Sequence, residues 1–324
     1  MLKFFLAKPI LFKAPIGITG SDTFPVTTNE YLKGVNKVCS QEFTNARPTN
    51  QLEDAFYEIK VDNGEVFEQT IIEMATETNF ERVAEGEQPD LSPVDPNLHV
   101  KYFNNWEEKQ FKVTKRITDI RKALTTGKSA EEVGGQIVAS LRDGEGDYHY
   151  RAMRAIIENS AVGADGATAL GGTPTNMKGV IFAIRQLYNI CKATNTKGGV
   201  PCKQGVDPDW IRLAISEKAL ALMDVTELAN IFNLDKEQLM GKIVKLPDDD
   251  TYDGTKVLVY DKRALLHGLK DDMYDEEELK GHKYVNYYLN TENAFAYCNL
   301  FKAFKLDIST AMTNAFGAIM TPNA

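Results

Sequence analysis

Cysteine and histidine are scarce in this 324-residue chain, which has four of each. The cysteines show no paired spacing, so they are expected to be reduced thiols and not a disulfide framework. The histidines are not spaced to bring two metal ligands together. No apolar run approaches the ~20 residues that a membrane-spanning helix needs. The residues concerned are Cys39, Cys191, Cys202 and Cys298, with His99, His149, His267 and His282.

Motifs for catalysis are equally absent. The glycine-rich run 163–175 follows a predicted helix and lacks the lysine of a P-loop, so it is expected to be a turn. The acidic run 248–254 has Tyr252 and Asp253 where a calcium loop needs an oxygen ligand and glycine. This run and residues 271–278 are expected to be solvated surface segments. We predict no catalytic, cofactor-binding or metal-binding residue, and the chain is not expected to be an enzyme.

Charge is uneven along the chain. The formal charge of −9 argues against a protein whose whole surface binds nucleic acid. In residues 1–50, by contrast, basic residues exceed acidic ones by three. This range has no sustained hydrophobic period, which predicts a mostly extended arm with one short helix at about residues 29–38. A solvated terminus and an arm facing packaged DNA or a neighbouring subunit both stay open.

Two stretches have the pattern of long strands joined by a polar excursion. In residues 56–73, Tyr57, Ile59 and Val61 alternate with charged residues, the period of a half-buried strand. Residues 109–118 alternate in the same way, and residues 79–96 between them have little apolar surface to bury. A two-stranded arm is marginally stable alone in water. We therefore expect it to lie on another surface, such as a neighbouring copy of the protein.

This arm carries a resemblance to a known family. The order Val83-Ala-Glu-Gly-Glu-Gln-Pro, a spacer, then Lys109-Gln-Phe-Lys-Val-Thr-Lys-Arg-Ile resembles the extended loop of tailed-phage major capsid proteins of the Hong Kong 97 type. The resemblance implies a loop tip that contacts another subunit, formed by Glu85, Gly86, Glu87 and Pro89. Some members cross-link through a lysine in this loop. Residues 79–98 contain no lysine, so we do not expect cross-linking here.

A long helix is predicted after the arm. Ser129 and Glu132 form a capping box, and apolar residues recur at helical spacing from Val133 onward. Gly144 and Gly146 each cost ~1 kcal/mol relative to alanine, so the helix is expected to bend or break near Gly144 and to end near residue 159. The resemblance makes this the spine helix of the capsid fold.

The second half of the chain is predicted to be rich in strands. Alternating or strongly β-prone runs occur at residues 211–215, 256–260, 283–290 and 304–308. A helix is expected from about residue 176 to 188, and Ser216 is placed to cap another. Helices and strands together predict an α+β protein.

The resemblance implies a structural role for the chain. It implies a major capsid protein that forms pentamers and hexamers, which close an icosahedral shell around packaged viral double-stranded DNA. The expected localisation is the virion capsid, assembled in the host cytoplasm and without a membrane. Contacts between subunits would run through the N-terminal arm and the extended loop, and scaffold, portal or decoration proteins would be further partners. An encapsulin-type compartment is the close alternative, and a soluble enzyme with a signature-free active site is the distant one.

The resemblance also divides the chain into four parts. The expected N-terminal arm comprises residues 1–50 and the extended β-hairpin loop residues 51–124. A peripheral domain with the spine helix comprises residues 125–175 and 282–324. An axial domain at the centre of each ring comprises residues 176–281.

Overall fold

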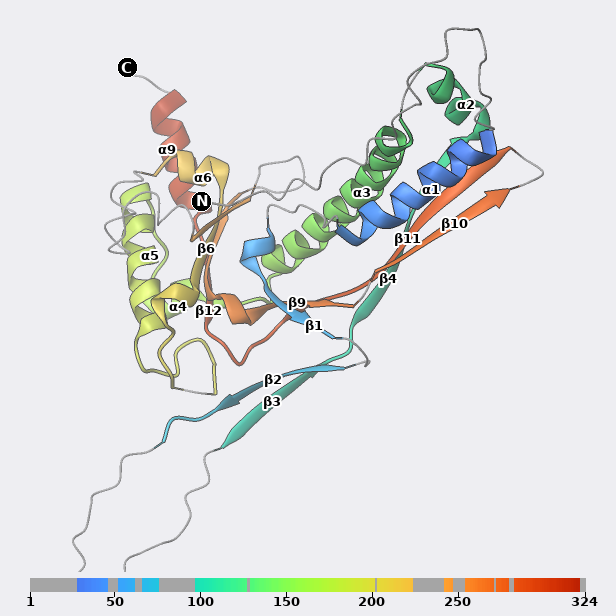
Figure 1. The fold of residues 1–324 in the computed structure, drawn as a ribbon. Coiled ribbons are helices and arrows are strands. Elements are labelled where there is room, and N and C mark those ends of the chain that lie inside the picture. Colours follow the sequence, from blue (N-terminus) through green and yellow to red (C-terminus); the bar gives the residue numbers. More distant parts are fainter. Residues whose placement is uncertain are drawn as a thin grey trace, which may run out of the picture.

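The computed structural model describes most of the chain, and Figure 1 shows how its elements are arranged. The described residues are 28–45, 52–61, 66–75, 97–126, 129–201, 203–223, 242–246, 254–270, 272–279 and 283–320. The α-helices are α1 (Thr28–Asn45), α2 (Ile117–Thr125), α3 (Ala130–Glu158), α4 (Gly166–Leu170), α5 (Met177–Lys192), α6 (Glu217–Ala221) and α9 (Ser309–Met320). The strands are β1 (Tyr57–Lys60), β2 (Phe67–Ile72), β3 (Leu98–Phe103), β4 (Trp106–Arg116), β5 (Ala164–Asp165), β6 (Ile211–Ser216), β7 (Ile243–Leu246), β8 (Lys256–Asp261), β9 (Leu265–Leu269), β10 (Met273–Leu279), β11 (Tyr284–Tyr297) and β12 (Ala303–Asp307). None of these helices is long and apolar enough to span a bilayer.

The first sheet is built around the 14-residue strand β11. Strands β10 and β9 pair with successive segments of one edge of β11, and β1 pairs with β9. Strand β4 pairs with the other edge of β11. Val285, Tyr287 and Leu289 of β11 are buried in one cluster with residues of α1 and α3. Figure 1 shows both helices lying along this sheet. The alternation predicted at residues 283–290 therefore does place one side of the strand in the core.

The second sheet has a core on each face. Its order is β5, β12, β8, β6, β7. The alternation of β6 sends Ile211, Leu213 and Ile215 into a cluster with α5, whereas Ala214 belongs to the cluster that contains Met153 of α3. Ser216 ends β6 and caps α6 by accepting a hydrogen bond from the backbone N–H of Ala219 at 3.0 Å. The predicted strand and cap are both confirmed.

The spine helix α3 is continuous over 29 residues, about 44 Å at 1.5 Å per residue. Its predicted cap is present, because Ser129 Oγ accepts a hydrogen bond from the Glu132 N–H at 3.1 Å. The predicted break near Gly144 is wrong. Gly146 is buried, and a Cβ on Gly144 would lie 3.4 Å from Phe111. Packing against the sheet therefore stabilises the helix at both glycines.

Helix α1 is longer than the sequence predicted. Eighteen residues are helical where a short helix at about 29–38 in an extended arm was expected. Tyr31, Val35 and Cys39 are buried against α3, one helical turn apart along α1. The close approach needs Gly134 of α3, where a Cβ would lie 2.9 Å from Val38 Cγ1. The helix predicted at about residues 29–38 is therefore confirmed, whereas the extended interpretation is wrong for residues 39–45. Residues 1–27 lie outside the described part.

The two predicted limbs do not pair with each other. β1 pairs in parallel with β9, β2 pairs with β3, and β4 pairs with β11. The first limb is thus two strands, and residues 98–103, which were not predicted as a strand, supply the partner of β2. Local alternation identifies a strand but not its partner, which depends on surfaces distant in sequence. Helix α2 takes over at Ile117, where the second limb was expected to continue as a strand.

The glycine-rich run 163–175 is more ordered than the predicted turn. It contains the short β5 and α4, and Asp165 caps α4 by accepting from the Ala167 N–H at 3.0 Å. The acidic surface segment predicted at residues 271–278, described from residue 272 onward, is largely the exposed strand β10. The other acidic run, at 248–253, lies outside the described residues.

The predicted domain ranges remain a prediction, but two sheet pairings run across them. β9 and β10 fall in the range expected for the axial domain and pair with β11 of the peripheral range. β12 falls in the peripheral range and pairs with β8. The sheets thus join segments that the sequence divided at residue 281.

Candidate assembly surfaces

The predicted loop tip lies outside the described residues. This applies to Glu85, Gly86, Glu87 and Pro89. The structure does describe the stem of the loop, residues 66–75 and 97–103, which we call the β2–β3 ribbon. Figure 1 shows this ribbon projecting from the two sheets.

The register of the ribbon fixes which side chains share a face. Phe67 lies opposite Phe103, and Ile72 lies opposite Leu98. A backbone hydrogen bond of 3.0 Å from Glu73 to residue 97 continues the ladder. Because side chains alternate between faces, odd-numbered residues of β2 lie on one face and even-numbered residues on the other.

The inner face of the ribbon is attached to its own chain. Phe67 and Phe103 are buried and stack with ring centroids 5.2 Å apart. Phe67 also meets Trp106 edge-on at 5.6 Å. Further along, Lys101 Nζ donates a hydrogen bond to Asn299 Oδ1 at 2.9 Å. These contacts hold the root of the ribbon on the first sheet.

The outer face is apolar and exposed. Of the eight exposed large hydrophobic residues in the described part of the chain, five follow the even-numbered alternation of β2 or its register partners. They are Val66, Ile72, Met74, Leu98 and Tyr102, with exposed fractions of 49, 53, 50, 59 and 65%. Glu68 and Thr70 are also exposed on this face, between Val66 and Ile72. A gathering of exposed apolar side chains of this kind marks an interaction site.

The far end of the ribbon is closed by polar contacts. Glu73 Oε1 lies 2.9 Å from His99 Nε2, and Asn97 Nδ2 donates to Glu73 Oε2 at 3.0 Å. Hydrogen bonding from His99, and then from Asn97, lowers the pKa of the Glu73 carboxyl. Gln204 Nε2 donates to the carbonyl of Ile72 at 2.9 Å. These hydrogen bonds fix the far end of the described ribbon.

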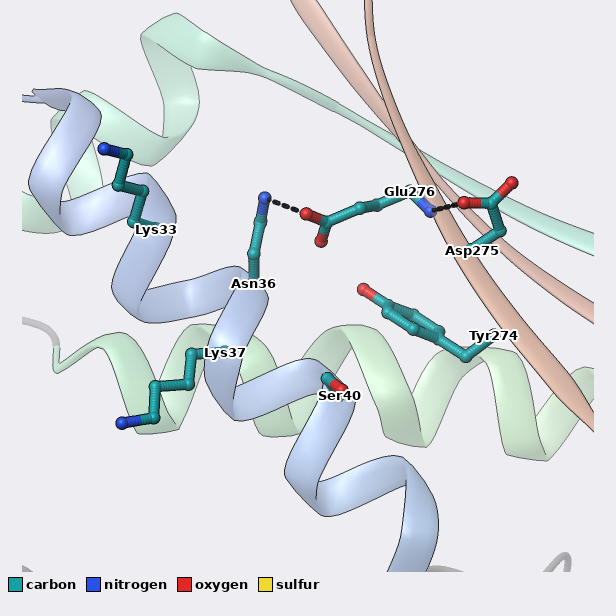
Figure 2. A pocket seen from close by; sticks show the side chains of 7 residues that line it. All are labelled: Lys33, Asn36, Lys37, Ser40, Tyr274, Asp275 and Glu276. Carbon is teal, nitrogen blue, oxygen red and sulfur yellow. Dashed lines mark hydrogen bonds between the residues drawn. The ribbon is translucent and has the colours of Figure 1, made fainter.

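Figure 2 shows a second surface, the groove between α1 and β10. Asn36 Nδ2 donates to Glu276 Oε1 at 2.8 Å and so joins the helix to the strand. In Figure 2 the lysines point away from the carboxylates, so the groove holds both charges without pairing them. It has no field of a single sign that would select a charged ligand. The lining residues are Lys33, Asn36, Lys37, Ser40, Tyr274, Asp275 and Glu276.

The described cysteines are poorly suited to nucleophilic chemistry. Cys39, Cys191 and Cys298 are free and buried. Burial raises the pKa of Cys39 to about 11 and that of Cys191 to about 12. Since the thiolate is the reactive form, these thiols are inert near neutrality. Within the described ranges, no group of three or more His, Cys, Asp or Glu residues could hold a metal ion.

Comparison with known proteins identifies the family. Residues 7–306 match the Phi29-like phage major capsid protein family. The chain belongs to this family. It is therefore a phage major capsid protein, a shell-forming component of the virion, as the resemblance of its extended loop implied. A search of curated proteins finds no match.

The major capsid protein has the Hong Kong 97-type fold predicted from its sequence. A capsid structure of Staphylococcus phage Andhra is similar to it with a TM-score of 0.58 and 12% identity, over 82% of this chain and 85% of that one. A structure from Microbacterium phage Oxtober96 matches at a TM-score of 0.49 and 12% identity, over 81% and 92% of the two chains. A virus-like particle from Pyrococcus furiosus matches at 0.44 and 15%, over 86% and 96%. The first of these shows the shared fold.

Sequence reasoning expected the arm to lie on a neighbouring copy and named residues of the loop tip, but it did not single out the outer face of the ribbon. The signal was present in the first limb, where Val66, Phe67, Ile71 and Ile72 put apolar residues on both faces of one strand. A half-buried strand has one polar face. Apolar residues on both faces therefore indicate two packing partners.

Proposed function

We propose that this major capsid protein assembles into pentamers and hexamers that close an icosahedral shell around double-stranded phage DNA. The observation that carries the proposal is the apolar outer face of the β2–β3 ribbon. The inner face is already packed on its own chain, so a neighbouring subunit is the natural partner for the outer one. Burying apolar surface at ~25 cal/mol per Å² would then drive association.

The ribbon would act together with the loop tip and the N-terminal arm. The loop tip at Glu85, Gly86, Glu87 and Pro89 would extend the contact beyond the ribbon. The N-terminal arm would add a second contact, beginning where α1 leaves the surface of α3. The peripheral domain (residues 125–175 and 282–324) and the axial domain (residues 176–281) would then occupy the rim and centre of each ring.

DNA contact would be non-specific and electrostatic. The excess of basic residues in residues 1–50 supports placing the N-terminal arm toward the lumen, since counterion release favours basic groups beside phosphates. We further propose that assembly takes place in the host cytoplasm, that scaffold, portal or decoration proteins act as additional partners, and that the role is structural and not catalytic.

Assembly can be tested on the purified full-length chain. Size-exclusion chromatography with electron microscopy should show rings or closed shells across a range of salt concentrations. A stable monomer at micromolar concentration under every condition would contradict the proposal. Nucleic-acid content of particles from infected cells tests the cargo, because an encapsulin-type compartment would hold protein instead of DNA.

A further inference from the structure

The seam between α3 and the first sheet is interrupted by a buried polar cluster. Toward one end, Ile137 and Leu141 pack with Leu289 in one apolar cluster. Toward the other, Met153 and Ile157 belong to a separate cluster. Between these two cores the buried side chains are polar or charged. They are Arg142, Glu145 and His149 of α3, His267 of β9, and Thr291 and Asn293 of β11.

One guanidinium joins the helix to the sheet across this gap. Arg142 Nη1 lies 2.6 Å from Glu145 Oε2 and 2.6 Å from Asp272 Oδ2. Asp272 precedes β10, so Arg142 ties α3 to the connection between β9 and β10. With both acids ionised, the three groups carry one positive and two negative charges. A net buried charge is costly, and it is removed if one carboxylate takes up a proton.

The neighbouring histidines do not neutralise this charge. His149 Nε2 lies 3.9 Å from Glu145 Oε1, and the His149 and His267 rings are 5.0 Å apart. His267 stacks on Phe295 at 4.5 Å and its Nε2 lies 3.2 Å from Asn293 Oδ1. Burial lowers the pKa of His149 to about 4 and that of His267 to about 3. Both rings are therefore neutral near pH 7.

Glu145 is the group whose protonation changes near neutrality. Burial, and then the Asp272 carboxylate, raise its pKa to about 7 in spite of Arg142. On the β4 side, Glu107 accepts a hydrogen bond from the Tyr148 hydroxyl at 2.9 Å. Lys109, also on β4, lies over the Tyr148 ring.

The cluster also leaves polar atoms without partners. In the part of the chain that the structure describes, four side-chain atoms of this cluster are buried with no hydrogen-bond partner. They are His149 Nε2, His267 Nδ1, Thr291 Oγ1 and Asn293 Nδ2. Unpartnered buried polar groups weaken packing, so this segment of the seam is held less firmly than the apolar clusters on either side.

We propose that Arg142, Glu145 and Asp272 form a proton-sensitive clamp that sets how firmly α3 is held on its sheet. With a proton on Glu145, the clamp is neutral and Arg142 pairs with Asp272. When the proton leaves, a net negative charge remains in the seam and the attachment loosens. The clamp lies within one subunit, so it is a property beyond shell formation and its test does not depend on assembly.

The sign of the effect follows from the raised pKa of Glu145. Its ordinary value is 4.5 and its value in the fold is about 7, so the fold loses stability as pH rises between these values. The two histidines act in the opposite direction, because their pKa values are lowered from 6.5 and they must be deprotonated in the fold. Comparing a Glu145 variant with the parent at each pH isolates the contribution of the Glu145 carboxyl to stability, because both proteins contain the two histidines.

Thermal unfolding of the full-length chain at low concentration provides the test. Glu145→Gln mimics the protonated acid, so its melting temperature relative to the parent should rise by roughly 3 to 6 °C between about pH 5 and pH 7.5. Asp147→Asn lies on the exposed side of the same helix, so its melting temperature should change with pH as that of the parent does. A difference between Glu145→Gln and the parent that does not change with pH would overturn the proposal.

A second variant covers the case in which Glu145→Gln does not fold. Asp272→Asn removes the like charge beside Glu145 and keeps the carboxyl itself. Hydrogen exchange measures the protection of the amides in α3. The midpoint pH at which this protection changes should be lower in Asp272→Asn than in the parent. An unchanged midpoint would show that the clamp does not titrate as a unit.

Discussion

Replacing Ile72 and Leu98 by serine tests the outer face of the β2–β3 ribbon most directly. The two residues lie opposite each other and are 53% and 59% exposed in the single subunit. Complete burial of such a side chain contributes ~1.5–3 kcal/mol, and about half of each remains to be buried on association. The pair should therefore weaken each ribbon contact by about 2 kcal/mol, roughly thirtyfold in its association constant.

The subunit itself should be little affected. Exposed substitutions of this kind change the free energy of unfolding by about 0.5 kcal/mol or less each. Circular dichroism and thermal unfolding should therefore be close to those of the parent. Light scattering against protein concentration, with electron microscopy of the products, should show that the threshold for assembly rises by more than tenfold.

Phe182→Ser is the matched control. Phe182 is as exposed as Leu98, but it lies on α5 and not on the ribbon. It should assemble at the concentration of the parent. If the Ile72/Leu98 variant also assembles normally, the outer face is not an interface. If all variants fail alike, loss of any exposed apolar surface would be the cause.

Three further changes separate assembly from folding. Gly86→Val should leave circular dichroism near that of the parent and impair assembly, whereas Gly86→Ala should be neutral, because side-chain size limits the expected turn. Gly134→Leu should lower the free energy of unfolding by about 1–3 kcal/mol through collision with Val38, and Gly135→Ala, with nothing within 4 Å, should not. Ser129→Ala should cost about 1 kcal/mol by removing the cap of α3, measured by denaturant unfolding.

Elements with strong local signals were predictable from the sequence. The cap at Ser129 and the end of α3 at Glu158 follow from side chains within a few residues of each helix end. β8, β11 and β12 follow from runs of β-prone or alternating residues. In each case the information lies inside the element, so no knowledge of the rest of the fold is needed.

Strand partners and helix continuity were not predictable in the same way. β4 has a strand pattern, but its partner β11 lies more than 160 residues further on. The two glycines near the middle of α3 weaken the helix locally, but Gly144 lies beside Phe111 of β4 and Gly146 is buried, so tertiary packing supports them. Similarly, the length of α1 depends on the space that Gly134 leaves on α3. These outcomes are decided by tertiary contacts that override local propensity.

The sequence shows that the ribbon has two apolar faces, and the fold shows which of them the subunit itself covers. Val66 and Ile72 on one face, and Phe67 and Ile71 on the other, are visible in the sequence, but they do not reveal which face the chain itself covers. The fold answers this, because Phe67 stacks on Phe103 and leaves the even-numbered face to solvent. An exposed apolar face is stabilised only when something covers it, and a shell protein has many identical neighbours available. The apolar surface left over after folding is thus the physical basis on which this capsid protein would assemble.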